Sequence, residues 1–326
     1  MFLYKLRLPG TTAPIAATSQ QLRDGIVPPG FVIAPFDTSR LPVVTIPSSP
    51  QHIDCQPDTT LTFPIPDRST PRDEHRHAVA TAAAFHAANG GKTVISRVIK
   101  TDPIPDPDAA FDALADAYPD ACVFTFDTPV TGHWIGASPE LLLSADGHSL
   151  PTMALAGTRP AGTAEPWDDK NREEQQLVTD FIADTLRRHN LSPNIGTRRP
   201  RRAGRIEHLM TPISAPIPDD WALPRLKALL ADLAPTPALG GFPRQESLRL
   251  IARLETHHRA YYGGYFGIVE SPRRFTLFVN LRSALVTPGN TYLYVGGGIT
   301  AKSRPDDEWT ETERKSNTLL AVFSKK

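Results

Sequence analysis

A sequence pattern typical of a helix ends at a glycine pair near residue 90, and a pattern typical of a strand begins directly after it. This junction constrains the fold more than any other feature. Thr70 as N-cap and Pro71 at the first helical position predict a helix that runs through an alanine-rich stretch. The sequence Asn89-Gly90-Gly91 ends that helix. The β-branched alternation of residues 92–99 then predicts a strand with Lys92 at its start.

The alternation continues along the chain. Residues 106–118 have a helical pattern, and residues 122–126 read as a strand joined by a hairpin to residues 133–136. The preceding region is less regular, because residues 1–70 are rich in proline, threonine and serine. Short apolar runs there, such as Phe31–Phe36, predict brief strands between turns. The whole pattern is compatible with an α+β fold but does not establish one alone.

The charge balance argues against two classes of partner. Lysine plus arginine equals aspartate plus glutamate at 35 each, so no net field attracts nucleic acid or an anionic membrane. The chain has no run of 18 apolar residues, and its first residues lack the pattern of a signal peptide, so we expect a cytoplasmic protein. The arginine-rich stretch 198–205 is predicted to be a solvated loop. Cys55 and Cys122 are far apart and are expected to be buried reduced thiols.

The end of the chain combines glycines with a charged helix. Gly296-Gly297-Gly298 closes a strand-like run, and a helix follows that contains Glu308, Glu311 and Lys315. Steps of three and four residues place these three side chains on one helical face. Taken alone, such a face is more often solvated and held by ordinary charge pairs. With suitable partners elsewhere in the chain, it suits a metal and an anionic ligand.

Candidate partners occur in the middle of the chain. Glu140 follows a serine and a proline at the start of an apolar strand, where a carboxylate can face a cavity. The small residues around Gly157 and Thr158 predict a turn whose backbone amides approach a ligand closely. Glu173 and Glu174 lie near the start of a predicted helix, where favourable interaction with the helix dipole is the simpler explanation for acidic residues.

From residue 207 onward several motifs follow one another in a fixed order. They are Glu207–Ile213, Leu233–Gly241, Gly263–Gly267, Asn280–Ala284, Gly296–Ile299 and the final Glu-Trp-x-Glu helix. This series resembles the chorismate-utilising enzymes related to anthranilate synthase component I, and within them isochorismate synthase most closely. The resemblance runs from about Lys92 to the C-terminus. It departs from the common His-Pro-Thr motif, which reads Ala234-Pro235-Thr236 here.

The resemblance implies a role for individual residues. Lys92 matches the general base that deprotonates a water for attack at C2 of chorismate. Glu140 matches the general acid that protonates the departing C4 hydroxyl. Glu174 and Glu311 match the two glutamates that hold Mg²⁺, and Glu308 resembles a carboxylate just outside those ligands.

The resemblance also implies a group of substrate-binding residues. Arg282 and the backbone amides of Gly157, Thr158, Gly296 and Gly297 match the groups that receive the substrate carboxylates. Two further side chains resemble an active-site cation and a substrate-side histidine; these are Lys315 and His208. Chorismate is a dianion, so a divalent cation and an arginine together would neutralise it and fix its ring.

The proposed chemistry sets requirements on the catalytic pair. A lysine acts as a base only where its ammonium is easier to deprotonate, so Lys92 should be partly enclosed. Glu140 must instead keep a proton near neutral pH, which burial promotes. Mg²⁺ prefers one or two carboxylates together with waters and substrate oxygens, in agreement with two glutamates from separate helices.

Single positions indicate which reaction of the family is carried out. The lysine at position 92 favours water over ammonia as the nucleophile. Ala156 stands where one type of aminodeoxychorismate synthase carries a nucleophilic lysine. Ala238 stands where salicylate synthases usually carry a threonine, and therefore favours isochorismate as the final product. Salicylate synthase, and a chorismate-fold binding protein without turnover, stay open as alternatives.

The resemblance finally implies the architecture. We expect a single large α+β domain, in which two packed, mainly antiparallel sheets are flanked by outer helices. Residues 1–70 would form an N-terminal extension that adds to the sheet, and residues 71–326 the chorismate-binding catalytic region. The expected partner is chorismate, with Mg²⁺ as cofactor and neither nucleic acid nor membrane. We further expect a monomer whose product enters menaquinone or catechol siderophore synthesis.

Overall fold

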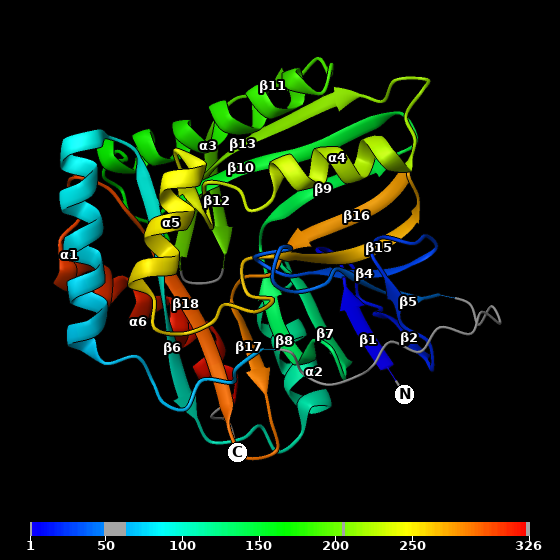
Figure 1. The fold of residues 1–326 in the computed structure, drawn as a ribbon, viewed down its shortest axis with the longest axis horizontal. Helices are drawn as coiled ribbons and strands as arrows, with labels where there is room; N and C mark the ends of the chain where they lie inside the picture. The colour runs from blue at the N-terminus through cyan, green and yellow to red at the C-terminus, as the bar shows by residue number, and fades with distance from the viewer. Residues whose placement is uncertain (1, 49–62, 204–205, 324–326) are drawn as a thin grey trace.

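The computed structural model describes residues 2–48, 63–203 and 206–323. Figure 1 shows a mixed α+β molecule in which helices surround layers of β-strands. The strand pairs in its sheets are antiparallel, as in the β6–β18 and β10–β13 ladders. The α+β class expected from the resemblance is therefore confirmed.

The largest sheet has eight strands, and the strands near one of its edges carry residues of the candidate site described below. In spatial order the eight strands are β14 (Gly241–Phe242), β6 (Lys92–Thr101), β18 (Thr291–Ile299), β17 (Ser283–Val286), β8 (Gly132–Ser138), β7 (Cys122–Thr128), β1 (Phe2–Arg7) and β2 (Ile15–Ser19). The neighbouring strands β6 and β18 come from segments about 190 residues apart in the sequence.

Two smaller ladders make up the other sheets. The six-stranded ladder runs β3 (Arg23–Asp24), β5 (Val44–Pro47), β4 (Gly30–Ala34), β15 (Tyr265–Ser271), β16 (Arg274–Val279) and β9 (Leu141–Asp146). The four-stranded ladder contains β10 (Ser149–Pro160), β13 (Ile206–Pro216), β11 (Asn194–Ile195) and β12 (Arg199–Ala203). The Thr152 hydroxyl on β10 donates to the Leu142 carbonyl on β9 at 2.6 Å, so the two ladders adjoin.

Aromatic side chains join the eight-stranded sheet to the six-stranded sheet. The rings of Phe124 on β7 and Phe266 on β15 lie 3.9 Å apart between centroids, and both are fully buried. Tyr4 on β1 stacks on Phe31 of β4 at 4.4 Å. Aromatic pairs of this kind add to the stabilisation that comes from burying their area. The two sheets therefore pack face to face, as expected.

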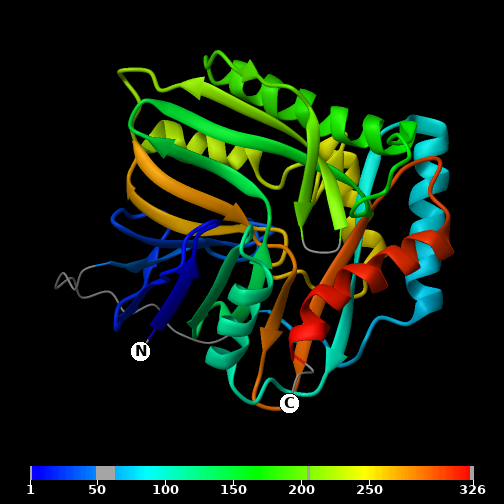
Figure 2. The same ribbon diagram turned by 180° about the vertical axis from the view of Figure 1, so that it is seen from behind.

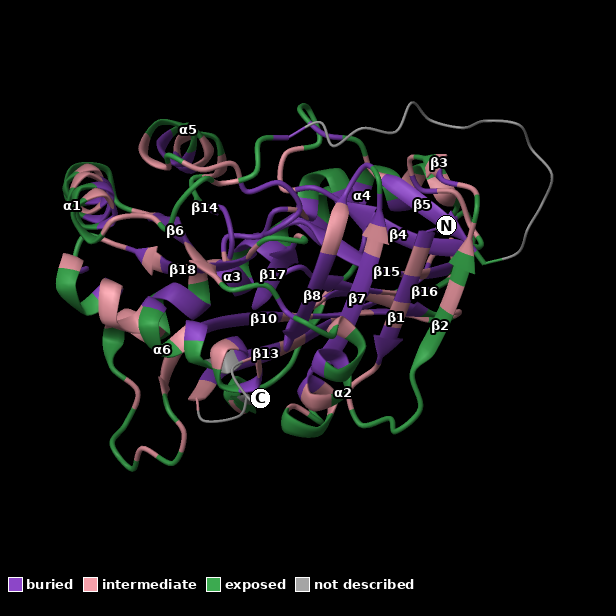
Figure 3. Cartoon of the chain, turned by 90° about the horizontal axis from the view of Figure 1, so that it is seen from below, coloured by how far each residue is buried: buried purple, intermediate pink, exposed green. Residues whose placement is uncertain are grey.

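Helices cover the outer faces of these layers. They are α1 (Arg72–Asn89), α2 (Pro107–Ala117), α3 (Asp169–Arg188), α4 (Leu223–Leu233), α5 (Arg244–Leu254) and α6 (Pro305–Phe323). Seen from behind, α6 crosses the outside of the eight-stranded sheet near α1 (Figure 2). The exposed residues of the helices face outward, and the strands between them are largely buried (Figure 3). Among the described residues, no helix is both long and apolar enough to cross a membrane.

Two local predictions were wrong. The helix α1 begins at Arg72, with Pro71 rather than Thr70 at the N-cap position. The Thr70 hydroxyl instead accepts a hydrogen bond from the Val98 amide at 3.0 Å and ties the helix start to β6. The arginine-rich stretch contains the strand β12, paired with β13, rather than only a solvated loop. Cys122 is a buried free thiol as expected, whereas Cys55 lies outside the described residues.

Candidate active site

The candidate active site is a cavity where the start of β6 and the end of β18 meet the turn before β9, together with α3 and α6. Every predicted site residue except Glu308 lines this cavity. Glu308 lies beside it, with Oε2 2.9 Å from the position that a Cβ on Gly297 would take. The structure thus brings together residues that are more than 200 positions apart in the sequence, such as Lys92 and Glu311.

Lys92 is the first residue of β6, and its surroundings fix its position. Its side chain is 3% exposed, and its Nζ lies 4.0 Å from Glu174 Oε2. The backbone is fixed because the Ser247 hydroxyl donates to the Lys92 carbonyl at 2.8 Å. A Cβ on Gly298 would lie only 2.6 Å from Lys92 Cε, so the glycine leaves room for the lysine side chain. Lys92 is enclosed, as its predicted role requires.

Glu140 is buried and lines the same cavity. The strand β9 begins one residue later, and backbone bonds with Val279 hold the turn, since the Val279 amide donates to the Glu140 carbonyl at 3.0 Å. Burial raises the pKa of Glu140 to about 8, although Lys92, Thr236 and Arg282 act in the opposite direction. A carboxyl group in this state keeps its proton at neutral pH and can donate it.

Arg282 and His208 form a fixed pair at the cavity wall. The Arg282 backbone adopts a left-handed conformation with φ of 49°. Its Nη2 donates to His208 Nε2 at 2.6 Å, while His208 Nδ1 lies 2.7 Å from the Gly157 carbonyl. Nδ1 therefore carries the proton and Nε2 accepts. Burial and the nearby Arg282 hold the pKa of His208 well below its usual value, in agreement with a neutral ring. His208 thus orients the arginine and lines the site.

Two carboxylates of α6 each face a lysine. Glu308 Oε1 lies 2.8 Å from Lys170 Nζ on α3, and Glu311 Oε1 lies 2.7 Å from Lys315 Nζ. Burial acts to raise the pKa of Glu311, but Lys315 and the other nearby lysines outweigh it, and the pKa is lowered. Glu311 is therefore ionised and available to a cation. Glu308 Oε2 is buried and has no hydrogen-bond partner among the described residues.

Glu174 completes this acidic group from α3. Burial raises its pKa, and the neighbouring Glu311 and Glu308 add to that effect, while Lys92 and Lys170 oppose it. Among the residues that the structure describes, no three acidic, histidine or cysteine side chains are arranged as a ready metal site. The donors are nevertheless the hard oxygens that Mg²⁺ prefers, and Glu308 Oε2 is an unused acceptor. This donor set fits a magnesium ion.

The end of β18 leaves one of its edges unpaired. The ladder with β17 covers Thr291–Tyr294, whereas the ladder with β6 extends to Ile299. Beyond Tyr294 the glycines therefore have no strand partner on the β17 side among the residues that the structure describes. The Gly296 carbonyl there accepts a hydrogen bond from Lys315 Nζ at 2.9 Å. Backbone groups of this free edge can bind a substrate carboxylate, because glycines bring them close to the cavity.

Comparison with known proteins agrees with this geometry. A family model described as chorismate binding enzyme matches residues 49–324. The chain belongs to this family. Isochorismate synthase EntC of Escherichia coli K12 is 33% identical to it over 280 residues, which span 79% of this chain and 68% of that protein.

Solved structures of chorismate-binding enzymes share the fold. A putative 2,3-dihydroxybenzoate-specific isochorismate synthase, DhbC, from Bacillus anthracis matches with a TM-score of 0.79 and 24% identity, over 98% of this chain and 95% of that chain. The menaquinone-specific isochorismate synthase MenF of Escherichia coli matches with a TM-score of 0.79 and 21% identity, over 99% of this chain and 89% of that chain. At these identities the likeness establishes the architecture only.

Some residues of the candidate site were missed in the sequence. Tyr262 and Leu155 line the cavity, and Lys170 pairs with Glu308 at its edge. Lys170 carried a signal, because it lies one helical turn before Glu174 and so shares its face. Tyr262 directly precedes a glycine pair that was recognised only as a motif. Leu155 is one apolar residue among many and had no distinguishing signal.

Proposed function

We propose that this chorismate-binding enzyme is an isochorismate synthase, which adds water at C2 of chorismate and removes the C4 hydroxyl. The proposal rests on one observation, which is that a single cavity contains one group suited to act as a base and another suited to act as an acid. Lys92 is an enclosed amine, and Glu140 is a carboxylic acid with a pKa of about 8. Groups that differ in this way are suited to the base and acid roles of one reaction.

The proposed reaction balances with these two groups. In its neutral form, the Lys92 amine takes a proton from a water whose oxygen forms a bond to C2. The two ring double bonds shift, from C1=C2 to C1=C6 and from C5=C6 to C4=C5, and the bond between C4 and its oxygen breaks. Glu140 gives its proton to that oxygen, which leaves as water. Chorismate and isochorismate are isomers, so one water is added and one is released.

Arg282, a bound Mg²⁺ and the free edge of β18 would orient the substrate. Arg282 is buried, and its pairing with His208 leaves further N–H groups of the guanidinium to receive a carboxylate. A bound Mg²⁺ would neutralise a substrate carboxylate, and Glu174 and Glu311 would hold it, with Glu308 beside them. Fixing the ring in this way converts the attack into an oriented step, which is a large part of the catalytic gain.

Product analysis tests the proposal. Purified protein is incubated with chorismate and MgCl₂, and the products are separated by chromatography with a matched reaction in EDTA. We expect isochorismate, with activity lost in EDTA. Salicylate plus pyruvate would identify a salicylate synthase instead. Anthranilate formed in the presence of ammonia would contradict both, and the absence of any product would indicate a binding protein.

The Lys92→Ala variant tests the base. We expect turnover to fall by about 10²–10⁴-fold, as when a general base is removed. Chorismate binding in the presence of magnesium, measured by calorimetry, should persist because Arg282 and the glycines are unchanged. Turnover like that of the wild type would remove Lys92 from the base role.

The cellular role is part of the same proposal. The relatives include enzymes named for menaquinone and for 2,3-dihydroxybenzoate, and we favour menaquinone synthesis. We also propose that the protein acts in the cytoplasm as a monomer. Size-exclusion chromatography with light scattering tests the monomer, and a dimer mass would contradict it.

A further inference from the structure

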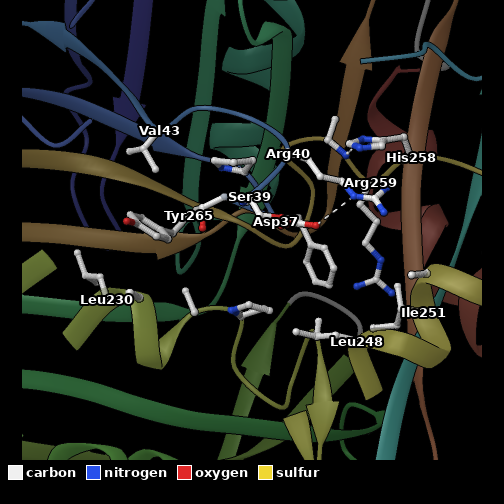
Figure 4. A pocket seen from close by; sticks show the side chains of 18 of the residues that line it. Asp37, Ser39, Arg40, Val43, Leu230, Leu248, Ile251, His258, Arg259 and Tyr265 are labelled. Atoms are coloured by element: carbon white, nitrogen blue, oxygen red, sulfur yellow. Dashed lines mark hydrogen bonds and ion pairs between the residues drawn. The ribbon is translucent and has the colours of Figure 1, made fainter. Parts of the chain in front are cut away.

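A second cavity of about 740 Å³ opens on the side of α4 and α5, and it shares no lining residue with the candidate active site. Its walls are the loop between β4 and β5, the two helices and the segment that precedes β15. Figure 4 shows Asp37, Ser39 and Arg40 of the loop opposite Leu230, Leu248 and Ile251 of the helices. Cavities of roughly 300–1,000 Å³ are the size that small organic ligands occupy.

The cavity is a formed feature, because hydrogen bonds fix its walls. The Phe36 amide donates to the Ala260 carbonyl at 3.0 Å, and the Tyr261 hydroxyl donates to the Pro42 carbonyl at 3.1 Å. Within the loop, the Ser39 amide and hydroxyl both donate to Asp37 Oδ1. These contacts hold the loop away from the helices at both of its ends.

Much of the lining is apolar, and the charged groups leave an excess of positive charge. Arg259 and Glu255 neutralise each other through two hydrogen bonds, of 2.5 and 2.8 Å. Arg40 lies 3.4 Å from Asp37. Lys227 and Arg244, in contrast, form no ion pair with a carboxylate among the described residues. The cavity therefore favours an anion.

Polar groups without partners also lie at this cavity. The Arg244 guanidinium donates to the carbonyls of Ala231, Asp232 and Ala234 at the end of α4. Its Nε–H has no partner among the residues that the structure describes. His257 is a lining residue with a side chain 5% exposed, and its Nδ1 is buried without a partner in the described part of the chain. An unpaired buried polar atom is costly, and a polar group on an occupant would satisfy it.

We propose that this cavity is a second ligand site, which takes a small organic acid with an aromatic or other apolar body. The apolar body lies against Leu230, Leu248 and Ile251. The carboxylate lies toward Lys227 and Arg244, two cations that form no ion pair with a carboxylate among the described residues. This inference goes beyond the proposed function and does not depend on it.

Calorimetric titration with 1-naphthoate tests the proposal, with 1-naphthalenemethanol as the uncharged analogue. We expect one naphthoate per chain, and weaker binding of the alcohol by roughly tenfold, since a charge-assisted bond contributes about 1.5 kcal/mol. Absence of measurable naphthoate binding at millimolar concentration would overturn the proposal, as would equal binding of the two probes.

Two variants, each with a matched control, locate the site. Ala252 is an exposed position of α5 that lines the cavity, so Ala252→Trp should fill it without disturbing the fold and should abolish binding. Ala80→Trp, at an exposed position of α1 outside the cavity, is the matched control and should bind like the wild type. Lys227→Gln should weaken binding by roughly fivefold, whereas Arg253→Gln on the outer face of α5 should not.

A final titration separates this cavity from the active site. Saturating chorismate, added to the slow Lys92→Ala variant, should leave the naphthoate stoichiometry unchanged. Displacement of naphthoate by chorismate, or naphthoate binding that survives Ala252→Trp, would place the probe elsewhere and overturn the proposal. These readouts are independent of whether the protein forms isochorismate.

Discussion

The protonated state of Glu140 affects folding as well as chemistry. In the unfolded chain this carboxyl releases its proton near pH 4.5, whereas in the folded protein it keeps the proton up to a pKa of about 8. Between these values the folded state binds more protons, so the free energy of unfolding falls as pH rises. The stabilising contribution is complete below pH 4.5 and is lost on approach to pH 8.

The Glu140→Gln variant removes this dependence. Between pH 4.5 and pH 7 the stability of the variant relative to the wild type should rise by about 3 kcal/mol, while turnover is lost. Urea denaturation at several pH values, followed by circular dichroism, measures the shift. A stability difference that does not change with pH would show that Glu140 is ionised.

In the wild type, we expect kcat to fall above pH 8 as the acid loses its proton.

Gly298 is predicted to matter for catalysis more than for stability. A methyl group there would lie 2.6 Å from Lys92 Cε and 3.0 Å from Glu174 Oε1, so Gly298→Ala must displace the lysine side chain. Because a displacement of about 1 Å can cost roughly 10²-fold in rate, kcat should fall strongly. Steady-state kinetics and a thermal melt measure the two effects.

Gly289→Ala is the matched control, since a Cβ at Gly289 would meet no atom within 4 Å. Its kinetics should be those of the wild type. Equal kcat values for the two alanine variants would contradict the role assigned to the space at Gly298.

The sequence predicted which residues gather at the cavity better than it predicted the contacts around them. Lys92, Glu140 and Glu311 occupy positions in ordered motifs, and the structure places all three at one cavity. The pairing of His208 with Arg282 could not be predicted, because it depends on the close approach of β13 to the segment before β17. A pattern identifies a residue type at a position, but distances between distant segments come only from the folded chain.

At the scale of elements, α6 is positioned by a buried arginine of β6. Arg97 Nε donates to the Thr312 hydroxyl at 2.8 Å, and the guanidinium lies 3.8 Å from the Trp309 ring centroid. Thr312 directly follows Glu311, so this contact fixes where the proposed magnesium ligands of α6 lie relative to β6. We expect Arg97→Met to lower affinity for Mg²⁺ by roughly tenfold, in addition to some loss of stability.

The magnesium dependence of turnover, together with calorimetric binding of Mg²⁺, measures this effect. Arg76→Met is the control, because Arg76 also contacts α6, through an exposed ion pair with Asp306 at 3.1 Å. Exposed pairs contribute little, about 0–1 kcal/mol. If both variants weaken Mg²⁺ equally, the buried contact has no special positioning role.

Element boundaries were predicted where local chemistry decides them. Asp106 caps α2 by accepting from the Asp108 and Ala109 amides, as a local signal would suggest. Thr70 had the same signal, but its hydroxyl binds the Val98 amide of β6 instead. The strand β12 was missed because a basic run interrupted by a proline is typical of a solvated loop, and only pairing with β13 makes this segment extended. Tertiary contacts override local preference in both cases.

At the scale of the whole molecule, the aromatic layer between the sheets should control stability without controlling the site. Phe266 is fully buried against Phe124 and lines neither cavity. Phe266→Ala should lower the free energy of unfolding by about 3–5 kcal/mol, with KM for chorismate unchanged at a temperature where the variant is folded. Urea denaturation and kinetics together test this.

Ile15→Ala serves as the control, because Ile15 on the edge strand β2 is 42% exposed. Its effect on the free energy of unfolding should be small.

The α+β class followed from the order of motifs, but the strand order did not. Alternating patterns show that a segment is a strand, whereas its neighbours are chosen by contacts that span much of the chain.

The pairing of β18 with β6 has a consequence for protein synthesis. β6 needs β18 as a neighbour, yet the ribosome makes β18 about 190 residues later. During that interval β6 has an unpaired edge that other nascent chains could extend, and such edges promote aggregation. Long-range pairing also folds slowly. The edge of β6 that β18 covers therefore stays open to pairing with other chains until β18 has been translated.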